Sequence, residues 1–224
     1  MRGLFVTGTG TGVGKTAVAA AACAALRARG EPVAAWKPVV TGTGEAPAGG
    51  WPPDHELLAL ACGGDPATVS PLAFAPPVSP HLAAALAGTR IEPAALLESA
   101  RRAAGDGLLV AEGVGGLLVP LTSGYLVRDL AVDLALPLLV AASPGLGTIN
   151  HTLLTVEAAR AAGLRVAAVV MTPWPERPSD LERSNRDTIA DLAGVEVATL
   201  PRIDEPAPAA LAAAGATLPL ERWA

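Results

Sequence analysis

The residues from Gly8 to Thr16 have the types and order of a phosphate-binding loop. The segment GTGTGVGKT follows the apolar run Leu4 to Val6 and precedes an alanine-rich stretch. In such a loop, backbone N–H groups converge on phosphate oxygens, the lysine reaches the outer phosphates, and the hydroxyl residue is a ligand for Mg²⁺. We therefore predict that Lys15 contacts phosphate and that Thr16 binds magnesium.

The spacing of this loop departs from the common pattern. The pattern places its first glycine at the position of Thr9, whereas this chain has Gly8 one residue earlier. A glycine-rich turn can also serve only to let a helix pack closely on a strand. Because Gly14, Lys15 and Thr16 stand together where a strand meets a helix, we favour phosphate binding over that alternative.

Lysine is rare in this chain, and this makes its second lysine informative. The sequence contains fourteen arginines, only two lysines, Lys15 and Lys37, and no glutamine. Lys37 directly follows the apolar run from Pro32 to Trp36. A compact ammonium group can approach a phosphate or lose its proton, whereas a guanidinium group cannot lose its own. We expect Lys37 to act at the site; the alternative is an incidental surface lysine.

Short apolar runs alternate with helical patterns along the chain. Strands are expected over residues 2–6, 32–36, 108–111, 138–142, 166–171 and 195–200. Helices are expected over residues 16–29, from 54 onward, and over 81–87, 92–104, 127–134, 150–162 and 179–192. Strands without polar alternation, separated by helices, indicate a parallel sheet covered on both faces. The sequence predicts a single-domain α/β P-loop fold over residues 1–224, with a doubly wound, mostly parallel sheet of about seven strands.

In such a sheet, ligands bind beyond the carboxyl ends of the strands. Glu112 ends one expected strand and is followed by glycines, and Asp54 begins an expected helix. Both carboxylates could hold Mg²⁺, although Asp54 could instead cap its helix and Glu112 could be a turn residue. The Gly/Pro-rich segment from Thr41 to Pro53 is too long to be idle in a compact domain, so we predict that it is a site loop.

Composition excludes several classes of function. With 224 residues, half of them apolar, the chain can bury a substantial core. Its net charge of −5 and its lack of a basic cluster argue against nucleic-acid binding. The apolar windows are too short to span a bilayer, and no leader pattern is seen, so we expect a cytoplasmic location and no membrane partner. Cys23 and Cys62 lack metal or redox spacing.

Six elements together resemble the ordered motif set of the dethiobiotin synthetases. They are GTGTGVGKT, Lys37-Pro38 with Thr41, Asp54, Ser79-Pro80-His81, EGVGG from Glu112, and GTINH from Gly147. Their order and intervals agree over most of the chain, and the lengthened phosphate loop is itself characteristic of that family. Each element alone would be a weak signal, whereas the set is specific.

The resemblance implies an ATP-dependent cyclo-ligase of biotin biosynthesis. In this family 7,8-diaminononanoate takes up CO2 as a carbamate, and ATP phosphorylates the carbamate. The second amine then attacks the mixed anhydride, which gives dethiobiotin, ADP and phosphate. The resemblance further implies Mg²⁺ as cofactor, ATP as co-substrate, and a homodimer with the substrate near its interface.

The resemblance also assigns roles to individual residues. Lys15 and Lys37 would be catalytic, and Thr16, Asp54 and Glu112 would bind Mg²⁺. Nucleotide contacts would add Gly12, Val13, Gly14, Ala17, Gly113, Val114, Gly115, Thr172 and Pro201. Contacts with the diamine or its carbamate would come from Thr11, Thr41, Ser79, Pro80, His81, Gly147, Thr148 and Asn150, the last three across the dimer interface.

Two residues depart from the family pattern. Gly10 stands where the family usually has Asp, and this removes a carboxylate beside the phosphates. Thr172 stands where many members have an Asn that reads the adenine edge. Because a hydroxyl offers fewer fixed hydrogen bonds than an amide, we expect only modest discrimination between ATP and CTP or GTP.

Two other functional classes were compared with this interpretation. A nucleotide switch of the partitioning or cell-division type typically has a second lysine at the position of Gly10 and often a basic or amphipathic surface, and neither is found. An amidating synthetase of corrin metabolism usually needs an additional glutaminase domain, for which we expect no room in 224 residues. We favour the synthetase.

Overall fold

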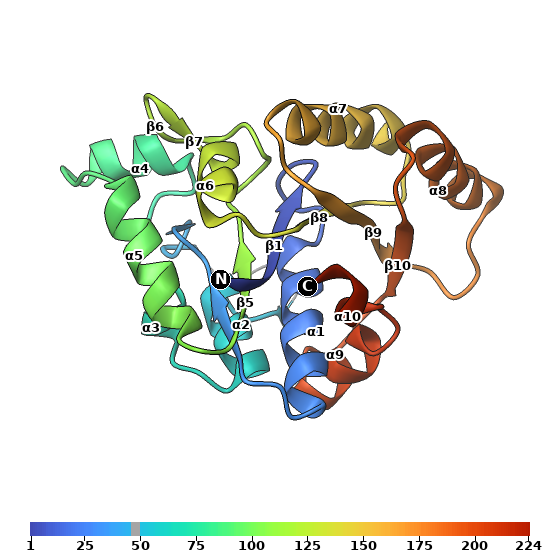
Figure 1. Ribbon diagram of the computed structural model, residues 1–224, viewed down its shortest axis with the longest axis horizontal. Helices are drawn as coiled ribbons and strands as arrows, with labels where there is room; N and C mark the ends of the chain where they lie inside the picture. The colour runs from blue at the N-terminus through green and yellow to red at the C-terminus, as the bar shows by residue number, and fades with distance from the viewer. Residues whose placement is uncertain (46–49) are drawn as a thin grey trace.

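The computed structural model describes residues 1–45 and 50–224 (Figure 1). Its central sheet has six strands in the order β10-β9-β8-β1-β5-β2, and every neighbouring pair is parallel. The strands are β1 (Arg2–Gly8), β2 (Val33–Trp36), β5 (Leu108–Glu112), β8 (Leu138–Ala142), β9 (Val166–Trp174) and β10 (Val197–Pro201). These are the six strands that the sequence located; the expected total of about seven was too high for the described residues.

The expected helices are all present, and each bound agrees to within two residues. They are α1 (Lys15–Ala28), α2 (Asp54–Cys62), α4 (Pro80–Leu86), α5 (Pro93–Ala104), α6 (Val127–Leu134), α7 (Thr148–Ala161) and α8 (Asp180–Ala193). Three short helices were not predicted from the sequence: α3 (Pro66–Val69), α9 (Pro208–Gly215) and α10 (Leu220–Trp223). Two of these are single turns, too short for a periodic apolar pattern to identify.

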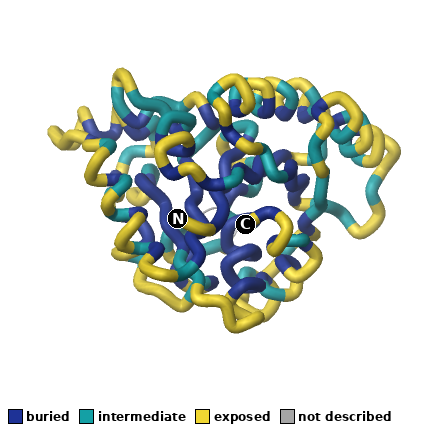
Figure 2. The backbone as a smooth tube through the Cα atoms, viewed as in Figure 1, coloured by how far each residue is buried: buried dark blue, intermediate teal, exposed yellow. Residues whose placement is uncertain are grey.

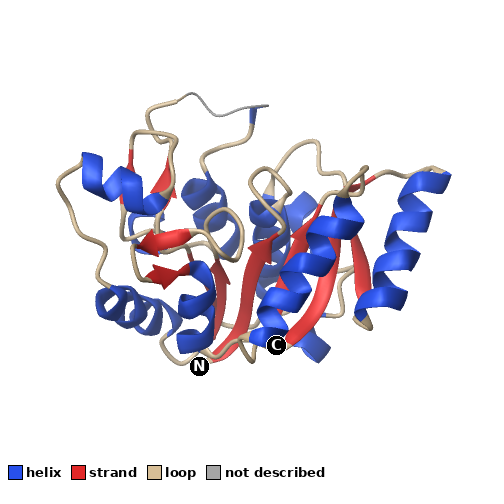
Figure 3. Cartoon of the chain, turned by 90° about the horizontal axis from the view of Figure 1, so that it is seen from above, coloured by secondary structure: helices blue, strands red, loops and turns tan. Residues whose placement is uncertain are grey.

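Helices cover both faces of the sheet, as Figure 3 shows. Successive side chains of β1 point to opposite faces, because a strand repeats every two residues. Leu4 and Val6 pack with α1, α2 and α9, whereas Phe5 packs with α4, α5, α6 and α7. The sheet therefore lies between two cores, and in Figure 2 its backbone is buried while the outer turns of the helices are exposed. The doubly wound α/β prediction is confirmed.

Two small sheets lie outside the central one. β3 (Val40–Thr41) pairs in parallel with β4 (Ala73–Phe74), and β6 (Pro120–Thr122) pairs with β7 (Tyr125–Leu126) in antiparallel fashion. The predicted site loop therefore begins in a strand, at Thr41. Residues 46–49 of that loop lie outside the described residues. No helix in the described ranges has the length and apolar character needed to cross a membrane.

The strand order places a ligand crevice beside β1. From β1 the chain passes through α1 to β2 at one edge of the sheet, whereas β8, β9 and β10 are added on the other side. An open parallel sheet binds ligands where its strand order reverses, beyond the carboxyl ends of the strands. The carboxyl ends that meet here are those of β1, β2 and β5, at Gly8, Trp36 and Glu112.

Helix α9 packs very closely on α1, the helix that follows the phosphate loop (Figure 1). A Cβ atom at Gly215 would lie 2.0 Å from the carbonyl oxygen of Ala21 and 2.9 Å from the Cβ of Ala25. The small residues on both helices make this approach possible. The position of α1, and with it the phosphate loop, thus depends on a side chain being absent at residue 215.

This contact predicts that Gly215→Ala destabilises the protein by about 1–3 kcal/mol, because the added methyl group meets rigid backbone. Alanine has the higher helix propensity, so propensity alone predicts the opposite sign. The control for an added methyl group without a contact is Gly124→Ala, in the turn between β6 and β7, since a Cβ at Gly124 meets none of the described residues within 4 Å. Urea unfolding measures both variants; equal stability of Gly215→Ala and Gly124→Ala would contradict the proposed contact.

Candidate active site

The turn after β1 closes around the side chain of Lys15. The Nζ of Lys15 donates to the carbonyl oxygen of Gly10 at 2.8 Å. Gly8 has no room for a side chain, since its Cβ would lie 2.7 Å from Val13 and 2.9 Å from Cγ of Lys15. The displaced glycine of the loop is therefore required by the loop's own packing. At Gly10, by contrast, a Cβ meets nothing within 4 Å.

The loop ends at Gly14, the N-cap of α1. Gly14 has a φ of 92°, in the left-handed region that favours glycine. A Cβ there would also come within 2.4 Å of the Thr172 methyl group at the end of β9. Among the described residues no side-chain hydrogen bond caps α1, and the first turn of α1 holds no acidic residue. Its amino-terminal N–H groups are thus available to an anion.

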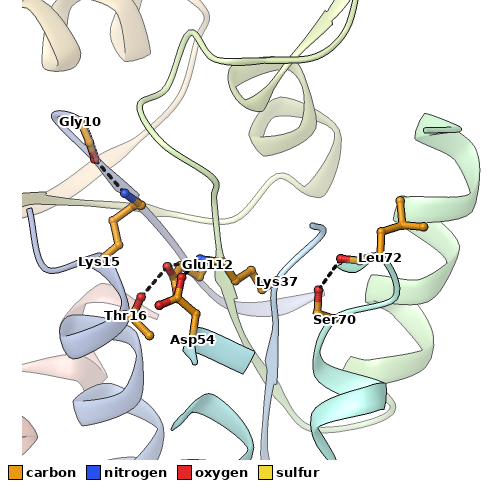
Figure 4. Close-up of polar contacts among 8 residues, drawn as sticks. All are labelled: Gly10, Lys15, Thr16, Lys37, Asp54, Ser70, Leu72 and Glu112. Carbon is orange, nitrogen blue, oxygen red and sulfur yellow. Dashed lines mark hydrogen bonds and ion pairs between the residues drawn. The ribbon is translucent and has the colours of Figure 1, made fainter. Parts of the chain in front are cut away.

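Lys37 lies buried between two carboxylates (Figure 4). Its Nζ is 2.9 Å from Oδ2 of Asp54 and 2.5 Å from Oε1 of Glu112. Only 3% of Lys37 is exposed, so it is not an incidental surface lysine. The N-cap of α2 is Pro53, and the Asp54 carboxylate pairs with Lys37. The capping and turn alternatives for the two acids are therefore not supported.

Glu112 joins this pair to the phosphate loop. The Thr16 hydroxyl donates to Oε1 of Glu112 at 3.0 Å. This one carboxylate oxygen therefore accepts hydrogen bonds from both Thr16 and Lys37. Glu112 is fully buried, and within the described residues its Oε2 has no hydrogen-bond partner. Leaving a buried carboxylate oxygen unsatisfied is costly. This oxygen therefore marks a place for a ligand.

The oxygens of this cluster fit a hard cation such as Mg²⁺. The hydroxyl of Thr16 and the carboxylates of Asp54 and Glu112 are ligands of the type that Mg²⁺ prefers. The part of the chain that the structure describes holds no group of three or more His, Cys, Asp or Glu arranged for a metal. A magnesium ion here must therefore complete its shell with phosphate or water, as is usual for nucleotide sites.

The charges in the cluster shift one another's pKa. Burial lowers the pKa of the Lys15 ammonium. Burial also acts to lower the pKa of Lys37, but the carboxylates of Glu112 and Asp54 outweigh it and the net shift is upward. Partial burial acts to raise the pKa of Asp54, but the charge of Lys37 outweighs it and the net pKa is lowered. For Glu112 complete burial is the larger effect, so its pKa is raised although Lys37 acts to lower it. The two carboxylates thus depend on a nearby cation to stay ionised.

A cleft of about 820 Å³ contains most of the predicted residues. The predicted residues that line it are Thr11, Gly12, Gly14, Lys15, Thr16, Ala17, Lys37, Thr41, Asp54, Ser79, Pro80, Glu112, Val114, Gly115, Thr172 and Pro201. Ser79 is the N-cap of α4, yet its side chain makes no capping hydrogen bond, which leaves its hydroxyl for a ligand. The fold thus brings seven separate segments of the chain to one site.

Other predicted residues lie outside this cleft. Val13 packs against the core beneath α1, the Gly113 N–H donates to Val6, and His81 is exposed on α4. Gly147, Thr148 and Asn150 lie at the start of α7. Gly147 and Asn150 are exposed, and the Thr148 hydroxyl is buried 3.4 Å from that of Thr152. The roles of these residues stay predictions.

The cleft also has walls that the sequence analysis did not name. They are Val39, Trp51, Pro77, Val78, Val119, Pro173, Arg202 and Ile203. Pro173, Arg202 and Ile203 adjoin the predicted Thr172 and Pro201 at the ends of β9 and β10, so a fuller use of the strand-end rule would have found them. Trp51 lies in the predicted site loop. The remaining apolar residues carried no chemical signal in the sequence.

Relatives of known name share most of this chain. It matches the family described as "AAA domain" over residues 2–209. The ATP-dependent dethiobiotin synthetase BioD of Anaeromyxobacter sp. (strain Fw109-5) is 44% identical over 207 residues, which cover 87% of this chain and 91% of the relative. The protein of the same name from Caulobacter sp. (strain K31) is 41% identical over 208 residues, 90% of this chain and 89% of the relative.

Solved structures of cell-division proteins share the fold. The MinC:MinD complex of Aquifex aeolicus matches with a TM-score of 0.56 at 14% identity, over 97% of this chain and 93% of that chain. The Pyrococcus furiosus cell division ATPase MinD matches with a TM-score of 0.56 at 17% identity, over 99% and 98%. At such identities the likeness concerns the fold alone. Because the named relatives are far more similar in sequence, the chain belongs to the ATP-dependent dethiobiotin synthetase family.

Proposed function

We propose that this chain converts 7,8-diaminononanoate, CO2 and ATP into dethiobiotin, ADP and phosphate, a step of biotin biosynthesis. The observation that carries the proposal is the buried Lys37 ammonium between Asp54 and Glu112, directly beside a phosphate loop. We further propose that residues 1–224 act as one nucleotide-binding synthetase domain, since one central sheet supplies the strand ends of the cleft.

The reaction requires three steps. An amine of the substrate adds to CO2 and loses a proton, which gives a carbamate. A carbamate oxygen then takes the γ-phosphoryl group of ATP, and ADP leaves. The second amine attacks the carbonyl carbon of this mixed anhydride and loses a proton, the C–O bond to phosphate breaks, phosphate leaves, and the ring closes. Such phosphoryl transfer depends mainly on in-line positioning and on neutralising charge.

The cleft supplies groups for that task. The N–H groups at the start of α1, with Lys15, would hold the outer phosphates, and Lys37 would neutralise charge on the carbamate and the transferring group. Thr16, Asp54 and Glu112 would hold Mg²⁺, which neutralises charge on the phosphate oxygens when bound. The described residues that line the cleft include no histidine and no cysteine, in keeping with direct transfer without a covalent protein intermediate.

The remaining walls suit the diamine. Thr41 and Ser79 offer hydroxyl groups, and Val39, Val78 and Val119 offer apolar surface for an aliphatic chain. These residues would bind the part of the substrate that does not react.

We propose that the active form is a homodimer. The start of α7 is not among the described residues that line this chain's own cleft, and exposed apolar side chains lie in the turn before α7, Leu146 at 91%, and in the middle of α7, Leu154 at 57%. A partner could cover this surface, and the N–H groups at the start of its α7 could then bind the substrate carboxylate. A cytoplasmic location and the absence of a nucleic-acid partner stay predictions from the sequence.

The first test is the reaction itself. We expect purified protein, supplied with diaminononanoate, bicarbonate, Mg²⁺ and ATP, to form dethiobiotin, which mass spectrometry detects. Omitting bicarbonate or ATP is the control. Absence of product, together with ATP hydrolysis that DNA or lipid stimulates, would instead favour a nucleotide switch.

The second test concerns Lys37. Lys37→Ala should lower turnover by about a hundredfold to a thousandfold, because it removes a charge from the transition state. It should also destabilise the fold by about 3–5 kcal/mol, since it leaves buried Glu112 unpaired. Lys37→Arg keeps the charge and more of the stability. It should still lose most turnover, because a planar, delocalised guanidinium cannot take the place of a compact ammonium group. Near-normal turnover of Lys37→Ala would refute the role.

The third test concerns the nucleotide base. The end of the cleft at β9 and β10 is lined by Thr172, Pro173, Pro201, Arg202 and Ile203, none of which has a carboxamide. We expect kcat/KM values for ATP, CTP and GTP to differ only modestly, and Thr172→Asn to increase the preference for ATP. Specificity for ATP of several thousandfold in the unaltered protein would contradict this expectation.

A further inference from the structure

We infer that Lys37 is the cation of the metal site while no nucleotide is bound, and that it leaves Asp54 and Glu112 when a metal–nucleotide complex binds. We call this change the cation exchange. It rests on the proposed function, because ATP is what would bring a divalent metal to the cleft. It goes beyond that function by giving Lys37 two positions.

Lys37 contacts the same carboxylate oxygens that would bind Mg²⁺. Lys37 Nζ contacts Oδ2 of Asp54 and Oε1 of Glu112, at 2.9 and 2.5 Å (Figure 4). Oε1 of Glu112 also accepts the Thr16 hydroxyl. Asp54, Glu112 and Thr16 are also the residues whose oxygens would bind Mg²⁺. An ammonium group and a divalent cation that both contact these oxygens repel each other at close range, so each weakens the binding of the other.

Burial explains why some cation must always be present. Glu112 is 0% exposed, and a buried carboxylate without a counter-charge is strongly disfavoured. Lys15 also acts to lower the pKa of Glu112, but within the described residues its Nζ donates to the carbonyl oxygen of Gly10 and forms no ion pair with either carboxylate. Oε2 of Glu112, buried and without a partner among the described residues, gives a second cation a point of contact. Glu112 can therefore change cations without standing unpaired.

The exchange has a consequence for the reaction. Once Lys37 leaves the carboxylates, its ammonium needs a new anion, and its long flexible stem gives it reach. The anions that the proposed reaction brings into the cleft are the γ-phosphoryl group and the carbamate. Lys37 therefore moves to the reacting atoms only after nucleotide has bound. The nucleotide-free protein should accordingly bind divalent metal poorly.

The test is a titration of Mn²⁺, which stands in for Mg²⁺, into nucleotide-free protein, with the free metal measured by electron paramagnetic resonance. We expect Lys37→Met to bind Mn²⁺ roughly tenfold or more tightly than the unaltered protein, because the competing charge is gone. Lys37→Arg, which keeps the charge, should bind it as poorly as the unaltered protein. The double variant Lys37→Met with Glu112→Gln should lose the gain, and this locates the metal.

The chain's other lysine provides the matched control. Lys15→Met removes the same charge from the same cleft without freeing a carboxylate oxygen, so its gain in affinity should be much smaller. Equal affinities of Lys37→Met and the unaltered protein, or equal gains from the two lysine variants, would overturn the inference.

A second measurement keeps the test valid if Lys37→Met is too unstable for the metal titration. Its thermal midpoint should then rise with added Mn²⁺ more steeply than that of the unaltered protein, because tighter binding stabilises more at equal metal concentration. A rise that is no steeper would also overturn the inference. These titrations contain no diamine and are scored separately from the dethiobiotin assay, so a failure of the cation exchange can be told apart from a failure of the proposed function.

Discussion

A buried negative charge is the constraint on which the site depends. Glu112 ends β5 inside the protein, where a carboxylate is tolerated only with a cation beside it. The fold meets this requirement from the neighbouring strand, because Lys37 follows the end of β2, which pairs with β5 in register at Trp36 and Ala111. Asp54, brought by α2, shares the same ammonium. Strand order, helix position and site chemistry are thus joined by one ion-pair cluster.

The phosphate loop depends on a different kind of constraint, which is steric. Gly8 and Gly14 are needed where a side chain would collide with the loop's own residues or with Thr172. Behind the loop, α1 is held by the close approach of α9 at Gly215. Ion pairing therefore holds the carboxylates and Lys37 in place. The backbone that would face phosphate is instead placed by close packing, which the glycines allow because they have no side chain.

The sequence predicted the elements of this arrangement better than their contacts. Apolar runs and strand ends located six strands and placed Lys37 and Glu112 at one edge, because these signals are local. The ion pair of Lys37 with Asp54 was not foreseen, since it joins segments whose distance is set by packing. The short helix α9 and the apolar walls at Val39 and Val78 were missed because nothing in their types distinguishes them from ordinary core or linker. The start of α7 lies away from the cleft, which a single sequence could not show.

Gly10 has a consequence for how such proteins can diverge. A Cβ atom at this position would meet none of the described residues within 4 Å, although Gly10 lies inside the phosphate loop and its carbonyl oxygen accepts a hydrogen bond from Lys15. A single codon change could therefore place an acidic, basic or neutral group beside the phosphates while the backbone keeps its shape. The shape of the loop depends on its backbone and on Gly8 and Gly14, whereas position 10 is sterically free to vary. One scaffold can in this way support different chemistries without a change of fold.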